Sequence, residues 1–159
     1  MTLSSIGYDV HQFAEGRPLI LGGVEIEHTH GLDGHSDADV LAHAIADAVL
    51  GAIGERDIGF HFPNSDQSIR GISSLEILRR AAALVAERHG RVLNIDATLI
   101  AEEPKISPHV AAMRANLAAA LGLPERRVGV KATTNERMGF LGRGEGIAAL
   151  AVASVELPE

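Results

Sequence analysis

Three side chains in the first third of the chain have the chemistry of metal ligands. Asp9 and His11 flank Val10 in residues 6–13, whose composition predicts a β-strand. Because side chains alternate across a strand, Asp9 and His11 should share one face while Val10 enters the core. A catalytic zinc takes about three protein ligands and leaves one position open, and His43 would complete that set. The Asp-x-His triplet alone also fits an exposed strand edge.

His43 lies in a segment with helical periodicity. Apolar residues recur at helical spacing over residues 40–52, and residues 36–39 resemble a capping box that would start the helix there. Asp47, one turn beyond His43, could accept a hydrogen bond from the imidazole and fix its tautomer. A solvated helix face is the simpler explanation of an acid at that position.

Two later segments carry groups suited to a phosphorylated ligand. Residues 131–136 leave a predicted strand with three consecutive short polar side chains and then Glu136, a hard oxygen ligand for magnesium or manganese. A turn stabilised by local backbone bonds would use the same residue types. Residues 101–107 offer backbone amides and Lys105, or simply connect a strand to a helix. The glycine-rich residues 139–146 lack the Walker lysine and do not form a nucleotide fingerprint.

Composition limits the classes of function. At 159 residues with 46% hydrophobic content, residues 1–159 are expected to form a single domain. The formal charge of -7, without a compensating basic cluster, argues against nucleic acid and anionic membranes as partners. There is no cysteine, so any metal must be held by histidine, carboxylate and water. Without a leader pattern or a long apolar run, the expected location is the cytoplasm.

The elements that must position these residues follow from the apolar patterns. Strands are predicted over residues 6–13, 19–21, 24–26, 92–101, 128–132 and 147–157, and helices over 40–52, 73–89 and 108–121. The first three strands suggest an opening meander, and residues 27–36, 56–68 and 139–146 are expected to be loops. Helices on one side of a mixed sheet give an α+β two-layer sandwich.

Together, these residues resemble the 2-C-methyl-D-erythritol 2,4-cyclodiphosphate synthase family over nearly the whole chain. Several separate motifs in the same order are far more specific than any one of them. The motifs are Asp9-Val10-His11, residues 34–40 with His43, Asp57-Ile58-Gly59, Phe62-Pro63, Pro104-Lys105, residues 131–136 and residues 142–146.

The resemblance implies an enzyme of the non-mevalonate isoprenoid pathway, a phosphorus-oxygen lyase. Its substrate would be 4-diphosphocytidyl-2-C-methyl-D-erythritol 2-phosphate. The 2-phosphate attacks the β-phosphorus of the diphosphate, which closes a cyclic diphosphate and expels CMP. The resemblance also implies a homotrimer with its active sites between neighbouring subunits.

The resemblance assigns roles to particular side chains. Asp9, His11 and His43 would be ligands of a zinc-type ion, and Glu136 would bind a second ion, magnesium or manganese, with the substrate diphosphate. His35 and Ser36 would position the phosphorylated methylerythritol. Thr134 would stabilise the transition state, which makes His35 and Thr134 the implied catalytic residues.

Further residues are implied in substrate binding. The sugar portions would be held by Asp57, Ile58, Gly59, Phe62, Pro63, Asn64, Ser65 and Asp66. The cytidine diphosphate would lie against Ala101, Glu102, Glu103, Pro104, Lys105, Ile106 and Ser107, together with Thr133, Thr134, Asn135 and Glu136. The substrate would also contact the Asp9-Val10-His11 segment. Phe140 and Arg143 would line a cavity at the trimer axis that could receive an isoprenoid diphosphate.

Two other functions fit parts of the same pattern. A zinc-dependent phosphodiesterase or other hydrolase would use the same three ligands to activate water. A non-catalytic trimer that binds an isoprenoid diphosphate would need only Phe140 and Arg143. The products formed from the cytidylyl substrate distinguish the three.

Overall fold

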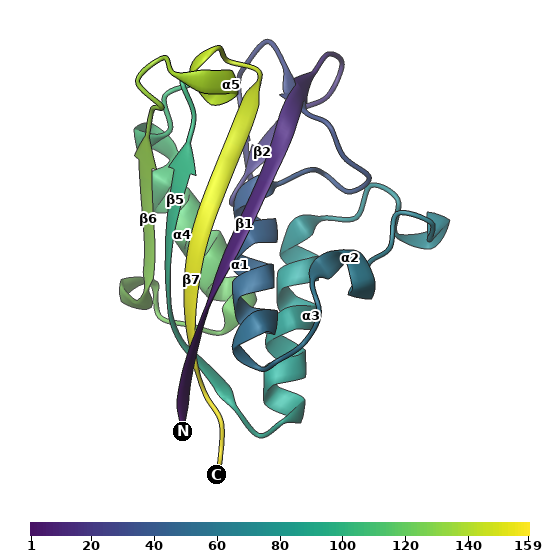
Figure 1. Ribbon diagram of the computed structural model, residues 1–159, viewed down its shortest axis with the longest axis vertical. Coiled ribbons are helices and arrows are strands. Elements are labelled where there is room, and N and C mark those ends of the chain that lie inside the picture. The colour runs from purple at the N-terminus through teal and green to yellow at the C-terminus, as the bar shows by residue number, and fades with distance from the viewer.

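A mixed five-stranded sheet with helices on one face forms the framework of the protein (Figure 1). The computed structural model describes residues 1–159, and the strand order is β4-β1-β7-β5-β6. Only β5 and β6 pair in parallel. The strands are β1 (Thr2–Ala14), β4 (Gly31–Leu32), β5 (Arg91–Ile100), β6 (Val128–Thr133) and β7 (Gly146–Glu156), with β2 (Leu19–Leu21) and β3 (Val24–Ile26) in a separate hairpin. The α+β class with a mixed sheet is confirmed.

The helices form the second layer, and both chain ends lie at the same end of the molecule (Figure 1). The α-helices are α1 (Val40–Ala52), α2 (Ile58–His61), α3 (Ser74–Glu87), α4 (Val110–Leu121) and α5 (Gly139–Gly142). Three short 3-10 helices complete the set: η1 (Gln67–Ile69), η2 (Ser107–His109) and η3 (Glu125–Arg127). None of the helices has the length and apolar character needed to cross a membrane.

Helix α1 is the centre of the core. Every residue of α1 except Asp47 and Gly51 is buried, because the helix packs on β1 and β7 on one side and on α3 on another. A helix that is apolar all round has to be enclosed in this way. The core around it is one aliphatic cluster of 37 buried residues.

Strand β1 touches α1 through a glycine. A Cβ atom built on Gly7 would lie 1.9 Å from the carbonyl oxygen of Ala44, so only glycine permits this approach. Ala44 follows His43, and Gly7 is two residues before Asp9 on the same face of the strand. The contact therefore sets the distance between the strand and helix that carry the candidate ligands.

The predicted opening meander is wrong. Strand β1 pairs antiparallel with β7 from Thr2↔Glu156 to Gln12↔Gly146, while β2 and β3 pair only with each other. Ten and more residues of continuous pairing with the last strand give β1 far more ladder hydrogen bonds than a three-residue hairpin strand could offer.

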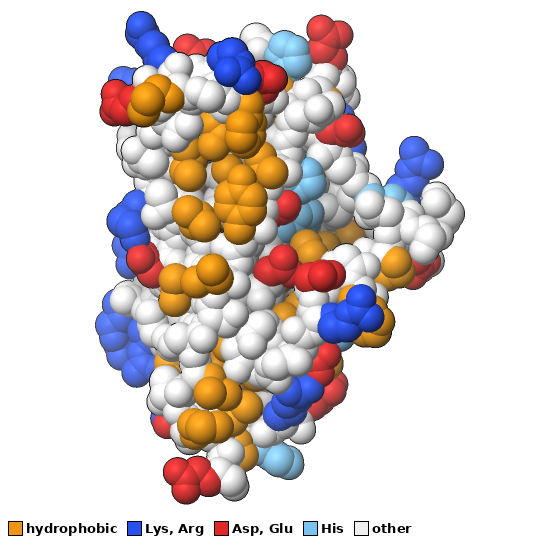
Figure 2. All heavy atoms as spheres, in the orientation of Figure 1, with side chains coloured by type: hydrophobic (Ala, Val, Ile, Leu, Met, Phe, Trp, Pro, Cys, Tyr) orange, Lys and Arg blue, Asp and Glu red, His pale blue; other side chains and the backbone are white.

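The prediction that Val10 enters the core is also wrong. Val10 is 37% exposed, next to Ile6 and Tyr8 on the face of the sheet that no helix covers. Alternation along β1 is as expected, but the helices cover the face of Gly7, Asp9 and His11 instead. Figure 2 shows hydrophobic side chains gathered along this uncovered face.

The regions expected to be loops contain short regular elements. Strand β4 lies in residues 27–36, α2 lies in residues 56–68, η1 begins in that region and ends at Ile69, and α5 lies in residues 139–146. In the second region, Asp57 and Asp66 start these turns, because their carboxylates accept the N–H groups of Phe60 (2.9 Å) and Ser68 (2.9 Å). Side-chain caps of this kind stabilise a single turn without an apolar stripe.

The predicted capping box does not form. Asp39 caps α1 by accepting the Ala42 N–H at 3.1 Å, and Ser36 lies outside the helix. Ala38 has φ of 58°, a left-handed conformation that an α-helix starting after Ser36 could not contain. The Ser36 hydroxyl is consequently free to contact His43.

We predict that Gly7→Ala lowers the free energy of unfolding by more than about 3 kcal/mol, because α1 must move away from β1. Gly54→Ala is the matched control: nothing lies within 4 Å of its added Cβ, and only its φ of +72° is unfavourable. That control should lose about 1–2 kcal/mol. Urea unfolding of both variants measures the difference, and equal losses would contradict the close contact.

Candidate metal centre and adjoining pocket

Three electron-rich atoms from β1 and α1 converge beside the core. Asp9 Oδ2 lies 2.9 Å from His11 Nε2 and 2.9 Å from His43 Nδ1, and the two nitrogens are 3.2 Å apart. Strand alternation puts Asp9 and His11 on the face that α1 covers, and α1 supplies His43. The predicted set of three ligands is therefore assembled within one chain.

The arrangement fits a divalent cation. Ligands about 2.0–2.1 Å from a tetrahedral ion are separated by roughly 3.3 Å, close to the distances among these atoms. His11 Nδ1 lies 2.6 Å from the carbonyl oxygen of Asp33, which can only accept, so Nδ1 carries the proton. In neutral His11 the lone pair is then on Nε2 and points at Asp9 and His43.

The shifted pKa values of Asp9 and His11 also indicate that a positive charge is favourable among these side chains. Burial alone would raise the pKa of Asp9, but its contacts with the two histidines, His11 first and then His43, outweigh burial and hold that pKa well below its ordinary value. Burial alone would lower the pKa of His11, but its hydrogen bond and attraction to Asp9 raise it above the ordinary value. A positive charge among these groups, either a proton or a metal cation, would offset the charge of the carboxylate.

A cavity of about 190 Å³ opens beside the three ligands. Its lining combines polar and apolar groups: Asp9, His11, Gly34, His35, Ser36, His43, Ile58, Gly59, Phe62, Asn64, Ile69, Ile72 and Ile77. The structure thus places His35 and Ser36, which the family resemblance assigns to substrate positioning, beside the three candidate ligands. The three isoleucines after residue 68 were not anticipated, and only their apolar character hinted at a lining role.

Residues 57–66 reach this cavity in part. Ile58, Gly59, Phe62 and Asn64 line it, while Asp57, Pro63, Ser65 and Asp66 do not. The carbonyl oxygen of Asp66 is nevertheless 3.0 Å from His35 Nε2. Hydrogen bonds from Ser68 hold the pKa of the Asp66 carboxyl below its ordinary value, which keeps it ionised as the cap of η1.

Asp47 does not contact the His43 ring. Its Oδ1 accepts the backbone N–H of Ile58 at 2.8 Å, and burial raises its pKa. The hypothesis that Asp47 fixes the His43 tautomer is therefore wrong, because the Asp47 carboxylate binds the first backbone N–H of α2 instead. The partners of His43 Nε2 are Ser36 Oγ at 3.0 Å and Ser74 Oγ at 2.8 Å.

Arg17 holds the segment that carries His35 and Ser36. Its guanidinium donates to the carbonyl oxygens of Gly34 and Ser36, both at 2.7 Å. Sequence reasoning missed Arg17, Asp33 and Ser74, and no spacing pattern connects any of them with the metal ligands. Three of the contacts, at Asp33, Gly34 and Ser36, involve backbone oxygens that every residue type provides.

The second predicted group of binding residues also assembles. The Ala101 N–H donates to the Thr133 carbonyl at 2.9 Å, and Glu102 Oε1 accepts the N–H groups of Asn135 (2.9 Å) and Arg137 (3.1 Å). Residues 101–107 and 133–136 are thereby held together. Glu136 is exposed, with φ of 52°, and its N–H donates to Thr134 Oγ1 at 3.2 Å.

One chain does not bring these two groups together. Asp9 pairs with Ala149, Ala149 with Leu99, and Leu99 with Ala132, so one row across the sheet joins β1 to β6. Three strand spacings amount to roughly 14 Å. Thr134 and Glu136, which follow β6, thus belong to the opposite edge of the sheet from the metal ligands.

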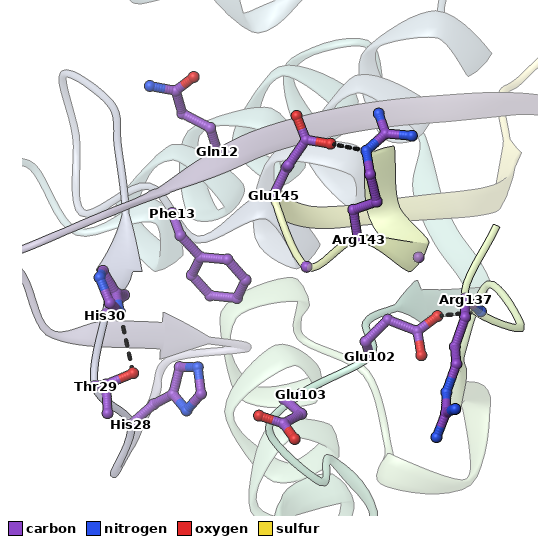
Figure 3. Close-up of a pocket in the computed structure, with 12 residues that line it drawn as sticks. Gln12, Phe13, His28, Thr29, His30, Glu102, Glu103, Arg137, Arg143 and Glu145 are labelled. Atoms are coloured by element: carbon purple, nitrogen blue, oxygen red, sulfur yellow. Dashed lines mark hydrogen bonds and ion pairs between the residues drawn. The ribbon is translucent and has the colours of Figure 1, made fainter. Parts of the chain in front are cut away.

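A larger cavity of about 860 Å³ lies at the end of the sheet where β1, β5 and α5 meet (Figure 3). Glu102, Glu103, Arg137 and Arg143 line it, opposite Phe13, His28 and His30. Arg143 Nε bonds Glu145 at 2.7 Å. Phe140 lines a different cavity, together with Val10 and His11, so Phe140 and Arg143 diverge within one chain.

The chain matches known proteins over its whole length. The model of the YgbB family matches residues 3–156. The 2-C-methyl-D-erythritol 2,4-cyclodiphosphate synthase of Akkermansia muciniphila is 59% identical over 160 residues, which cover 100% of this chain and 95% of that protein.

Solved structures agree in fold. The IspF of Plasmodium falciparum, in a CDP complex, is 32% identical with a TM-score of 0.86, and the match covers 99% of this chain and 97% of that one. The bifunctional IspDF of Campylobacter jejuni is 43% identical with a TM-score of 0.95, and all of this chain corresponds to 43% of it. From its sequence and its fold alike, the chain belongs to the YgbB family.

Proposed function

We propose that this protein converts 4-diphosphocytidyl-2-C-methyl-D-erythritol 2-phosphate to 2-C-methyl-D-erythritol 2,4-cyclodiphosphate with release of CMP. The observation that carries the proposal is the three-ligand group opening into a pocket lined by His35 and Ser36. Full-length identity of 59% to a synthase with this product in its name supports it. A 2-phosphate oxygen forms a bond to the β-phosphorus, and the bond from that phosphorus to the bridging oxygen breaks, so CMP leaves with that oxygen.

The metal-binding part of the site would neutralise and orient the reacting phosphate. Asp9, His11 and His43 would hold a zinc ion, which supplies Lewis-acid polarisation of the β-phosphate. His35 and Ser36 would position the methylerythritol phosphate at the mouth of the pocket. Because nucleophile and leaving group belong to one molecule, correct folding of the substrate can contribute roughly 7–11 kcal/mol.

The cytidine diphosphate would occupy the segments that Glu102 ties together. Backbone groups of residues 101–107 and 133–136 would hold the nucleotide. The Thr134 hydroxyl would donate a hydrogen bond in the transition state, and Glu136 would bind a magnesium or manganese ion. The Glu136 carboxylate is exposed and makes no hydrogen bond or ion pair within the chain, which leaves it available. CDP in the P. falciparum structure supports a cytidine nucleotide as the ligand.

The complete site would lie between copies of the chain in a homotrimer. The metal ligands lie at the β1 side of the sheet and the nucleotide segments at the β6 side, so one copy must offer its β6 side to the next copy's β1 side. A head-to-tail contact of this kind closes into a ring. The uncovered apolar face would be buried at the centre of that ring, through Ile6, Tyr8, Val10, Leu150 and Val152.

A cavity at the ring axis would accept an isoprenoid diphosphate. Phe140 is 44% exposed and shares its cavity with Val10, which supplies apolar surface for a hydrocarbon chain. Arg143 is exposed and could donate to a diphosphate when it leaves Glu145. Three copies around an axis would supply three such apolar surfaces and three arginine side chains to one ligand.

The products test the reaction. With zinc and magnesium in ¹⁸O-water, the protein should form the cyclic diphosphate and CMP in equal amounts, with no ¹⁸O in either, because the nucleophile is the substrate's own phosphate. Phosphorus NMR and mass spectrometry identify the products. Formation of ¹⁸O-labelled methylerythritol 2,4-bisphosphate with CMP would identify a hydrolase, and no turnover would favour the non-catalytic trimer.

Glu136→Ala should leave zinc bound and reduce kcat by about 10²-fold or more, because the charge that balances the second metal is lost. The dependence of turnover on magnesium or manganese should weaken as well. The matched control is Glu87→Ala, an exposed acid on α3. Metal analysis and steady-state rates separate the two effects, and loss of zinc from Glu136→Ala would reassign the ligands.

Val152→Asp should convert the trimer to monomers that still bind zinc but turn over no substrate. A charge placed opposite Ile6 on β1 would be buried against the other copies without a partner. Ala83→Asp, which alters the exposed side of α3, should stay trimeric. Sedimentation velocity reports the mass, and a monomeric Val152→Asp protein with full activity would contradict the shared site.

A further inference from the structure

A buried chain of hydrogen bonds continues from the metal ligands into the protein. His43 Nε2, the ring nitrogen that faces away from Asp9, lies 2.8 Å from Ser74 Oγ. Ser74 is the first residue of α3 and is fully buried, and its hydroxyl is hydrogen bonded to Asp37 Oδ1. The order is therefore imidazole, hydroxyl, carboxylate, and it spans three separate segments of the chain.

The directions of these hydrogen bonds follow from the acceptors. Asp37 accepts the N–H groups of Ser74 at 3.0 Å and Asp39 at 3.1 Å, which commits its carboxylate oxygens as acceptors. The single Ser74 proton is then donated to Asp37, and Ser74 Oγ can only accept from His43. Nε2 of His43 must carry the proton. Ser36 Oγ, which accepts the Ala38 N–H at 3.1 Å, is the second neighbour of that nitrogen.

We propose that Ser74 and Asp37 are positioning residues for the metal centre, which fix His43 in the tautomer with its lone pair on Nδ1. That nitrogen is the one that lies 2.9 Å from Asp9 and 3.2 Å from His11. The Asp33 carbonyl does the same for His11 through Nδ1. Each histidine ligand thus has an acceptor behind it that decides which nitrogen faces the ion.

The proposal rests on the metal site of the proposed function and not on its substrate. Ser74 could instead serve only to satisfy the buried start of α3, since its N–H and hydroxyl both meet Asp37. A purely structural role would change stability and leave the tautomer of His43 and the intrinsic affinity for zinc unchanged. The readouts are therefore the tautomer and the affinity.

The first measurement needs no substitution at Ser74 or Asp37, which form a hydrogen-bond relay with His43. Nitrogen chemical shifts of His43 in the zinc-free protein, assigned by their absence in His43→Ala, should show a protonated Nε2 and an unprotonated Nδ1. A neutral His43 with its proton on Nδ1 would overturn the proposal.

The second measurement is the affinity for Zn²⁺ alone, by competition with a chelator. Ser74→Ala should weaken binding about 10–100-fold, the usual effect of removing such a partner. Asp37→Asn should weaken it similarly, because an amide N–H directed at Ser74 Oγ would turn the serine proton toward Nε2. Ser74→Thr keeps a hydroxyl and should restore most of the affinity.

Ser73→Ala is the matched control, because Ser73 is the exposed neighbour and its side chain makes no capping bond. It should bind zinc as the parent does. Parental affinity in folded Ser74→Ala, with His43→Ala unable to bind zinc, would refute the relay and leave the metal site intact. Zinc binding unaffected by His43→Ala would instead refute the metal site itself.

Discussion

The geometry of the candidate metal centre depends on how closely α1 can approach β1. At Gly7 the strand has no side chain, and the Ala44 carbonyl of α1 occupies the place where a Cβ would be. One residue before Ala44 is His43, and two residues after Gly7 is Asp9. A larger residue at this point would separate the helix from the strand, and Asp9 and His43 would no longer meet at 2.9 Å. Backbone packing beside the candidate ligands therefore sets the geometry of the group.

With that distance fixed, the remaining problem is electrostatic. Asp9, His11 and His43 present acceptor atoms to one another at about hydrogen-bond distance, an arrangement that is unfavourable unless a proton or a cation lies among them. A proton on His11, whose pKa is raised by its hydrogen bond to Asp9, is one way to supply this positive charge. A metal ion bound among the three side chains is the other. Residues 33–39 fix which nitrogens face this site, because Asp33 and Asp37 direct acceptors at the outer nitrogens, Asp37 through Ser74. Arg17 in turn holds part of this segment in place.

The sequence predicted the features that depend on local pattern. Strand alternation gave Asp9 and His11 a common face, and helical spacing placed α1 at residues 40–52. What failed depended on contacts distant in sequence: the pairing of β1 with β7, and hence the exposure of Val10, follow from which face the helices cover. The outer contacts of the site could not have been predicted either. The Asp33 carbonyl has no residue-type signal, and nothing in the spacing of Asp37 and Ser74 indicates that α3 begins against α1.

The separation of the two binding groups across the sheet has a physical rationale. A substrate with a diphosphate and a further phosphate brings several negative charges to a chain of net charge -7, so each phosphate needs a cation or a set of amides. Two divalent ions held by one rigid strand would repel each other before substrate arrived. In the proposed site, one ion would lie on β1 and α1 and the other at Glu136 beyond β6, so the isolated chain would keep them apart and assembly with a second copy would bring them to opposite sides of the same diphosphate. The charge of the substrate then offsets the repulsion, so the second ion should bind together with the diphosphate rather than before it.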